Sequence, residues 1–235
     1  MPAQRSNRRP VVARALAKGG SAALRAAERF SENGGPTLAG DRWVEWSFCL
    51  ARLADGPGDT MDFGADIGFL SLAAAQRGHR VIAFDRLPSS LEYEHDLVTH
   101  VQGDILEDAP GDRAFDQILN CSSVEHVGLG GRYGSPDAPE GDLQAMDIMR
   151  GLLAPGGRMI MTVPVGRDMI CNPFHRIYGT DRLERLTAGY EVAEEQYWRK
   201  PPGEPRWRHV DRAEALSEVG SERFYALGLF VLTTG

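Results

Sequence analysis

The chain has 235 residues, of which 42% are hydrophobic, and this size and composition fit one sizeable α/β domain rather than a disordered protein. Its three cysteines are widely spaced, which excludes a disulfide framework and a zinc knuckle, and no apolar run reaches the ~18–20 residues that span a bilayer. We therefore expect a soluble, cytoplasmic protein without a membrane partner.

The net charge of −7 hides an asymmetry between the two ends of the chain. Residues 1–30 carry seven basic side chains and one acid, Glu28, so the remainder carries about −13. We interpret residues 1–35 as a basic N-terminal tail and helix, with a targeting peptide or a nucleic-acid arm as alternatives. Residues 36–235 are predicted to form a single domain. Its acidity disfavours a nucleic-acid partner, because phosphate binding needs a basic surface.

Helical and strand-like patterns alternate along the chain. Helices are predicted over 40–56, 68–78, 89–95, 142–153 and 180–190, and strands over 59–63, 80–85, 97–104, 115–123, 154–166, 191–198 and 223–235. This alternation predicts an α/β fold with a doubly wound, Rossmann-like sheet of seven strands. The sheet should be mostly parallel with an antiparallel last strand, preceded by a helical N-terminal extension. The loops at 127–141 and 199–222 are predicted to be lids or caps.

The stretch MDFGADIG (61–68) joins the first strand to its helix. Glycines are needed there, at Gly64 and Gly68, because the chain turns sharply and a ligand must approach bare backbone. Asp66 stands where a dinucleotide-binding loop would have its next glycine. A carboxylate so close to a pyrophosphate costs about 1 kcal/mol or more, whereas a cationic cofactor tolerates it. The stretch therefore disfavours a nicotinamide-dependent dehydrogenase.

Polar residues also follow the next three strands. Asp85 ends the second strand, where an acid can accept both hydroxyls of a ribose, and Asp104 follows the third, where a carboxylate can take an adenine amino group. The fourth strand ends in Asn120, Cys121 and Ser122. Ligands of doubly wound sheets bind outside these carboxyl ends, so we expect the side chains to meet in one site.

The ordered set MDFGADIG, VIAFD, VQGDILE, FDQILNCSSVEHV and LLAPGGRMIMTVPVG resembles the class I S-adenosylmethionine-dependent methyltransferases over residues 57–166. The resemblance implies S-adenosyl-L-methionine as cofactor. The cofactor-binding residues that we predict are Asp62, Phe63, Gly64, Asp66, Gly68, Asp85, Arg86, Gly103, Asp104, Ile105, Asn120, Cys121 and Ser122. Among them, the resemblance implies Asp62, Gly64, Gly68, Asn120 and Cys121 at the methionine part, Asp85 at the ribose, and Asp104 with Ile105 at the adenine.

The loop SSVEHVGLGGRYGSPDAPEGD is similar to that of a methyltransferase-like family of unassigned function, in which an EHxGLGRYGDP pattern recurs. This chain departs from the pattern by an extra glycine, Gly130 or Gly131, and by Ser135 in place of an aspartate. Those departures leave the role of the loop's side chains open.

Three residues are candidates for acid–base chemistry: Glu125 and His126 after the fourth strand, and His175 after the fifth. Each histidine has a packing role as its alternative, and Cys121 without a base partner is better explained by packing or cofactor contact than by nucleophilic attack. A divalent metal held by these residues with Asp137, Glu140 and Asp142 lacks the tight ligand spacing of a metal site, so we predict none.

The basic and aromatic stretch YWRKPPGEPRWRHV (197–210) is either a cap over an anionic or aromatic substrate or an exposed Pro-rich connection. We predict a methyltransferase that acts on oxygen or nitrogen of a small-molecule substrate, such as a sugar or secondary metabolite, in biosynthesis. The alternative is a non-catalytic S-adenosylmethionine-binding or scaffold protein of the same fold. A homodimer is one option for its assembly.

Overall fold

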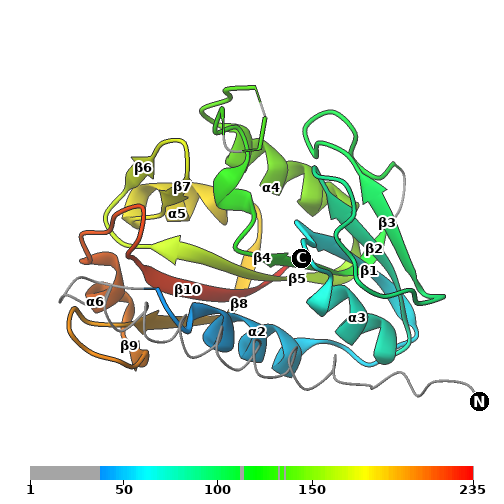
Figure 1. The fold of residues 1–235 in the computed structure, drawn as a ribbon, viewed down its shortest axis with the longest axis horizontal. Helices are drawn as coiled ribbons and strands as arrows, with labels where there is room; N and C mark the ends of the chain where they lie inside the picture. Colours follow the sequence, from blue (N-terminus) through cyan, green and yellow to red (C-terminus); the bar gives the residue numbers. More distant parts are fainter. Residues whose placement is uncertain (1–37, 112–113, 132, 135, 235) are drawn as a thin grey trace, which may run out of the picture. The chain divides into compact units, whose positions relative to one another are not determined.

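The computed structural model describes residues 38–111, 114–131, 133–134 and 136–234 (Figure 1). The tail and helix predicted over 1–35 lie outside these ranges. Within them, no helix is both long and apolar enough to cross a membrane.

A central sheet organises the described part of the chain. Its strands are β1 (Gly58–Phe63), β2 (His79–Asp85), β3 (Val98–Gln102), β4 (Phe115–Cys121), β5 (Leu153–Val165), β8 (Glu191–Arg199), β9 (Arg208–Val210) and β10 (Ala226–Thr233). Their order is β3-β2-β1-β4-β5-β10-β8-β9. The first five strands pair in parallel, and the pairs β5–β10, β10–β8 and β8–β9 are antiparallel. The mainly parallel sheet and the antiparallel last strand are thus confirmed.

The predicted count of seven strands is wrong, because the main sheet has eight. The eighth, β9, is a three-residue edge strand that pairs with β8, and a separate hairpin joins β6 (Met169–Cys171) to β7 (His175–Ile177). Strands this short carry too few residues for an alternating apolar pattern to emerge from the sequence.

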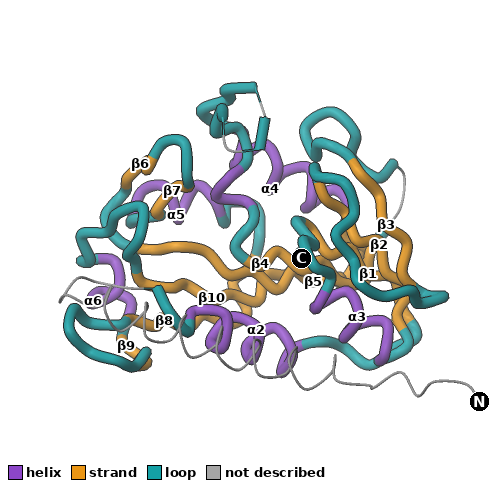
Figure 2. The backbone as a smooth tube through the Cα atoms, viewed as in Figure 1, coloured by secondary structure: helices purple, strands orange, loops and turns teal. Residues whose placement is uncertain are grey.

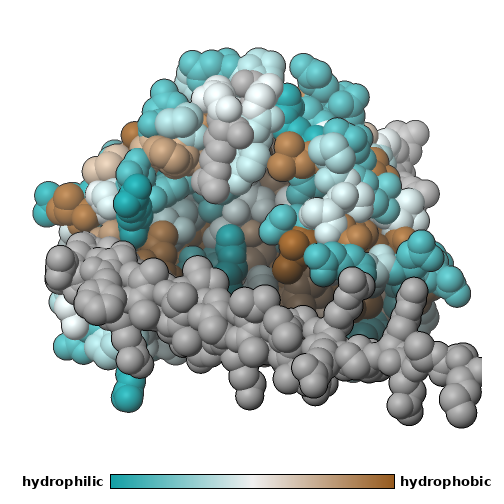
Figure 3. Space-filling view, in the orientation of Figure 1, coloured by the Kyte–Doolittle hydropathy of each residue, from teal (hydrophilic) through white to brown (hydrophobic). Residues whose placement is uncertain are grey.

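Helices lie on both faces of the sheet, as Figures 1 and 2 show. They are α2 (Asp41–Arg52), α3 (Phe69–Gln76), the 3₁₀ turn η1 (Val124–His126), α4 (Gly141–Leu152), α5 (Thr180–Leu186) and α6 (Arg212–Leu216). Successive residues of a strand point to opposite faces, so Ile118 of β4 packs in the same cluster as Met149 of α4. Its neighbour Leu119 packs with Phe48 of α2 and Ala74 of α3. Hydrophilic side chains predominate on the described surface in Figure 3.

The helix predicted over 89–95 is absent, and the segment is irregular instead. Its side chains bond to the turn after β1: the Ser90 hydroxyl donates to the carbonyl of Asp66, and the Tyr93 hydroxyl donates to the carbonyl of Gly68, each at 2.6 Å. These contacts replace the segment's own helical hydrogen bonds.

Candidate functional site

A cavity of about 230 Å³ opens at the carboxyl ends of β1, β2, β3 and β4. The predicted cofactor residues that line it are Asp62, Phe63, Gly64, Asp66, Asp85, Arg86, Gly103, Asp104, Ile105, Cys121 and Ser122. His126 also lines the cavity, whereas Gly68 and Asn120 do not. The topology therefore brings together predicted residues from Asp62 to His126, 64 positions apart in the chain, as the order of parallel strands predicted.

The turn after β1 is built on left-handed backbone. Gly64 has φ +72°, and a side chain there would lie 2.2 Å from the Ser123 hydroxyl. Asp66 also has a positive φ, of +47°, a conformation that aspartate tolerates better than most residues. Its backbone N–H donates to Asp85 Oδ2 at 3.0 Å. Asp66 therefore turns the chain and ties this turn to the end of β2.

Gly68, with φ +71°, directly precedes α3. A side chain at this position would lie 2.1 Å from the Leu91 side chain and 2.6 Å from the Tyr93 hydroxyl. The glycine thus leaves room for the irregular segment that follows β2, while its neighbours Ile67 and Phe69 line the cavity.

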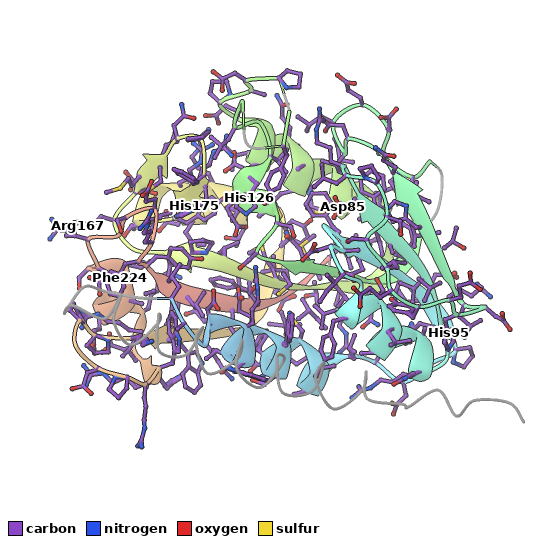
Figure 4. All side chains as sticks on the ribbon, in the orientation of Figure 1. Asp85, His95, His126, Arg167, His175 and Phe224 are labelled. Atoms are coloured by element: carbon purple, nitrogen blue, oxygen red, sulfur yellow. The ribbon has the colours of Figure 1, made fainter. Side chains whose placement is uncertain are left out.

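Backbone donors fix the Asp85 carboxylate in orientation. Oδ1 accepts from Leu87 N–H at 2.8 Å, and Oδ2 accepts from Asp66 N–H. Each oxygen keeps a further lone pair, because a carboxylate oxygen can accept two hydrogen bonds. Asp85 can therefore still accept a pair of ligand hydroxyls (Figure 4 shows its place at the end of β2).

Arg86 neutralises the acid that follows β3. Its Nη1 pairs with Asp104 Oδ2, while Nε donates to the carbonyl of Tyr133 at 2.9 Å and Nη2 to that of Gly134 at 2.8 Å. Asp104 Oδ1 accepts from Leu106 N–H at 3.0 Å. The guanidinium thus joins the predicted adenine end of the cavity to the tip of the loop 127–141.

Asp62 is a buried carboxylate beneath the turn after β1, and the Ser71 hydroxyl donates to its Oδ2 at 2.6 Å. Burial raises the pKa of Asp62 to about 6, against the lowering effect of the Ser71 hydrogen bonds and with a smaller contribution from Asp85. A cationic ligand group would favour the ionised form and so bind well here.

Asn120, Cys121 and Ser122 have different surroundings at the end of β4. Asn120 is fully buried: its Oδ1 accepts from Val124 N–H at 3.2 Å, and its Nδ2 lies 3.8 Å from the sulfur of Met146. Asn120 therefore stabilises the turn that leads into η1 and does not line the cavity. The hydrogen bond with Cys49, followed by burial, raises the pKa of the Cys121 thiol well above its usual range, which makes it a poor nucleophile.

Helix α2 contributes three residues to the site that were not predicted. Arg42 and Trp46 line the cavity, and the Trp46 ring stacks on Phe69 with centroids 4.5 Å apart. Glu45 is fully buried; its Oε1 accepts from the hydroxyls of Ser122 and, at 2.8 Å, Thr162. The burial of Glu45 could have been predicted from its spacing, because it precedes Phe48 and Cys49 by three and four residues. This spacing places the acid on the apolar face of the helix.

His126 is the one predicted catalytic residue that lines the cavity. Its Nδ1 lies 2.6 Å from the carbonyl oxygen of Phe174. A carbonyl only accepts, so Nδ1 carries the hydrogen, and Nε2 is the basic nitrogen of the neutral ring. Nε2 lies 3.8 Å from Glu125 Oε1, beyond hydrogen-bonding distance.

His175 lies beside His126, as Figure 4 shows. The ring centroids of His126 and His175 are 6.4 Å apart, and the His175 ring packs edge-on against the Tyr225 ring, with centroids 5.1 Å apart. His175 and Glu125 are buried and do not line the cavity. His175 and Glu125 therefore pack beneath the residues of the cavity wall and do not contact a ligand in the cavity directly.

The base of the loop 127–141 is held by a fully buried arginine, Arg176 of β7. Its guanidinium donates to the carbonyls of Val127, at 2.5 Å, Ala138 and Pro139. Asp142, in the first turn of α4, is a buried ion-pair partner of Arg182, at 2.6 Å. Among the described residues, no group of three His, Cys, Asp or Glu side chains could hold a metal ion.

The basic and aromatic stretch 197–210 packs against the start of α2. Lys200 Nζ and Trp207 Nε1 donate to the carbonyl of Ala39 at 3.0 and 3.2 Å. None of residues 199–222 lines the cavity. The stretch therefore helps to hold α2, and through α2 it supports Arg42 and Trp46.

A family model described as "Caenorhabditis protein of unknown function, DUF268" matches residues 74–200. No curated protein matches the chain. Among solved structures, the 1,6-didemethyltoxoflavin-N1-methyltransferase of Burkholderia thailandensis, with 1,6-didemethyltoxoflavin and S-adenosylhomocysteine bound, has a TM-score of 0.58 and 18% identity over 100% of this chain and 94% of that one.

The N-methyltransferase NodS of Bradyrhizobium japonicum, in complex with S-adenosylhomocysteine, has a TM-score of 0.55 and 18% identity over 89% of this chain and 97% of that one. An S-adenosylmethionine-dependent methyltransferase of Methanosarcina mazei has a TM-score of 0.53 and 10% identity over 79% and 96% of the two chains. At these identities the likeness establishes the fold, which is that of the class I methyltransferases.

Proposed function

The chain belongs to the DUF268 family, which has no assigned function, and from its cavity we propose that it is an S-adenosylmethionine-dependent methyltransferase acting on a small molecule. One observation supports the proposal most directly: acidic side chains and glycine backbone line one cavity at the carboxyl ends of β1 to β4. There, two backbone N–H groups orient the Asp85 carboxylate, and its remaining lone pairs can accept from a ligand. The related folds that hold S-adenosylhomocysteine support it.

The cavity lining suits the chemistry of this cofactor. S-adenosylmethionine has a ribose diol, an ammonium and a sulfonium but no phosphate, and the lining acids Asp62, Asp66, Asp85 and Asp104 would repel phosphate. When bound, the cofactor supplies an electrophilic methyl group. Asp85 would accept from the ribose hydroxyls, Asp104 and Ile105 would hold the adenine, and Asp62 would pair with the ammonium.

The chain's own contribution to methyl transfer is to position the reactants and to exclude water. Val127 and Tyr133 of the loop 127–141 line the cavity, and Arg86 and Arg176 anchor the loop, which supports its proposed role as a lid. His126 is the candidate general base for an acceptor that must lose a proton from oxygen or nitrogen. The acceptor belongs to the small molecules, of which sugars and secondary metabolites are examples, and the resemblance of the loop to the EHxGLGRYGDP pattern stays a prediction.

Calorimetry with S-adenosylhomocysteine tests the cofactor assignment. We expect binding to the wild type and a loss of at least tenfold in affinity for Asp85→Ala, because two hydroxyls lose a charged acceptor. Asp116→Ala, at the amino end of β4, is the matched control and should bind like the wild type. Unchanged binding by Asp85→Ala would remove the ribose assignment.

A non-catalytic cofactor-binding or scaffold protein would bind S-adenosylhomocysteine equally well. Transfer of a labelled methyl group to a broad panel of hydroxyl and amine compounds separates the two functions. The cytoplasmic location, the absence of nucleic-acid and membrane partners and the homodimer option stay predictions.

A further inference from the structure

Among the residues that the structure describes, the guanidinium groups of Arg42 and Arg86 line the cavity, and they differ in how many of their N–H donors already have partners. Arg86 is bonded to Asp104 and to the carbonyls of Tyr133 and Gly134. The Arg42 side chain makes a single such bond within the described part of the chain, from Nη1 to Glu45 Oε2 at 2.7 Å. Its Nε and Nη2 therefore keep donors for a ligand, and the side chain is 48% exposed.

Glu45 fixes Arg42 relative to the sheet. The carboxylate has a side-chain exposure of 1%, and it accepts from Arg42, Ser122 and Thr162, which belong to α2, the end of β4 and β5. A buried carboxylate is tolerated only with such partners. Because all three are present, the guanidinium is held in one place beside Ser122, whose φ of +48° turns the chain along the cavity wall.

Within the described lining, the charges favour an anionic group beside Arg42. The remaining wall carries the carboxylates of Asp62, Asp66, Asp85 and Asp104, and within the described part of the chain Asp104 is the one that pairs with an arginine. A ligand carboxylate would be repelled along this wall and attracted to Arg42. Through Glu45 and Ser122, Arg42 is tied to the end of β4, which β1 separates from the predicted ribose and adenine end at β2 and β3.

We propose that Arg42 binds the carboxylate of the cofactor's amino-acid moiety, and that Glu45 is the positioning residue that holds Arg42 for it. The inference rests on the proposed function, since S-adenosylmethionine has one anionic group, its carboxylate. It makes α2 a part of the cofactor site. An anionic group of the acceptor is the other source of a carboxylate, and the test below distinguishes the two.

The test compares two ligands with and without the amino-acid moiety: S-adenosylhomocysteine and 5′-methylthioadenosine. Calorimetry on Arg42→Gln should show at least tenfold weaker binding of S-adenosylhomocysteine and a change of less than twofold for 5′-methylthioadenosine. Arg52→Gln is the matched control, because Arg52 lies on the same helix and pairs with Glu194, outside the cavity. It should leave both affinities as in the wild type.

Glu45→Gln keeps an oxygen for the Ser122 and Thr162 hydroxyls but loses the charge that holds Arg42. It should lower the affinity for S-adenosylhomocysteine several-fold and spare 5′-methylthioadenosine, whereas a purely structural role would weaken both alike. The double variant should bind no more weakly than Arg42→Gln alone, because Glu45 acts through Arg42. Additive losses would overturn its positioning role.

Equal losses for the two ligands, or no loss in Arg42→Gln, would overturn the carboxylate assignment. If Arg42→Gln binds S-adenosylhomocysteine like the wild type but binds an anionic acceptor more weakly, Arg42 belongs to the acceptor site. That result would also overturn the assignment of Arg42 to the cofactor carboxylate. Failure of the wild type to bind S-adenosylhomocysteine at all would count against the proposed function itself. The two proposals therefore fail by different measurements.

Discussion

Replacing Asp62 with asparagine should stabilise the folded protein at neutral pH, although this residue lines the candidate site. The carboxyl is buried under the turn after β1, and burial raises its pKa from an ordinary 3.8 to about 6. A difference of about two pH units between the folded and unfolded chain corresponds to about 3 kcal/mol. The asparagine carries no charge, and its oxygen can still accept from Ser71.

The sign of the effect follows from the direction of the pKa shift. Because the folded protein holds the Asp62 proton more tightly than the unfolded chain, this carboxyl favours folding most below about pH 4. That contribution is lost as the pH rises to about 6 and is absent above it. Between pH 5 and pH 7.5 the wild type should therefore lose about 1.4 kcal/mol of stability that the asparagine variant keeps.

Urea unfolding of both proteins at pH 5 and pH 7.5 measures this difference directly. Asp66→Asn is the matched control, since Asp66 lies in the same turn but is exposed, and asparagine also tolerates its left-handed backbone. Equal pH dependence of stability in the wild type and Asp62→Asn would refute the reasoning. The variant should also bind S-adenosylhomocysteine more weakly at pH 7.5, because the ammonium loses its carboxylate.

Three further outcomes are expected. Gly64→Ala should abolish S-adenosylhomocysteine binding in calorimetry, because the new methyl group would lie 2.2 Å from the Ser123 hydroxyl at a φ of +72°; tight binding would show that the turn can yield. Arg176→Met should destabilise the protein by about 3–5 kcal/mol in urea unfolding, since it leaves buried Asp142 and three loop carbonyls with fewer donors; a loss under 1 kcal/mol would contradict this. Arg86→Gln should speed amide hydrogen exchange in the loop 127–141 while sparing β4, and unchanged exchange would argue against the anchor.

The alternation of strands and helices was readable from the sequence because central strands are continuous apolar runs that end in polar residues. Asp85 and Cys121 therefore mark strand ends correctly. The parallel order of these strands then made their convergence on one cavity predictable. For the parallel strands, the local sequence pattern and the observed strand order therefore lead to the same site.

Residues whose role depends on distant partners escaped prediction. Segment 89–95 has helical composition, but its hydroxyls bond to the turn after β1. Glu45 resembles any acid on an amphipathic helix until β4 and β5 supply Ser122 and Thr162. Gly68 was assigned to ligand approach, whereas the side chains of Leu91 and Tyr93 occupy the space in which its own would lie. Tertiary contacts decide these positions, and no local pattern encodes them.

The two arginines that hold the loop 127–141 divide it into parts that can change independently. Arg176 fastens the ends at Val127 and Ala138, and Arg86 takes only main-chain carbonyls at Tyr133 and Gly134, which any residue supplies. Around Gly134 there is open space on the side where a side chain would lie. The Arg86 hydrogen bonds therefore place no demand on the side chains at these two positions, and under the proposed function the loop could change in sequence there without loss of its anchor.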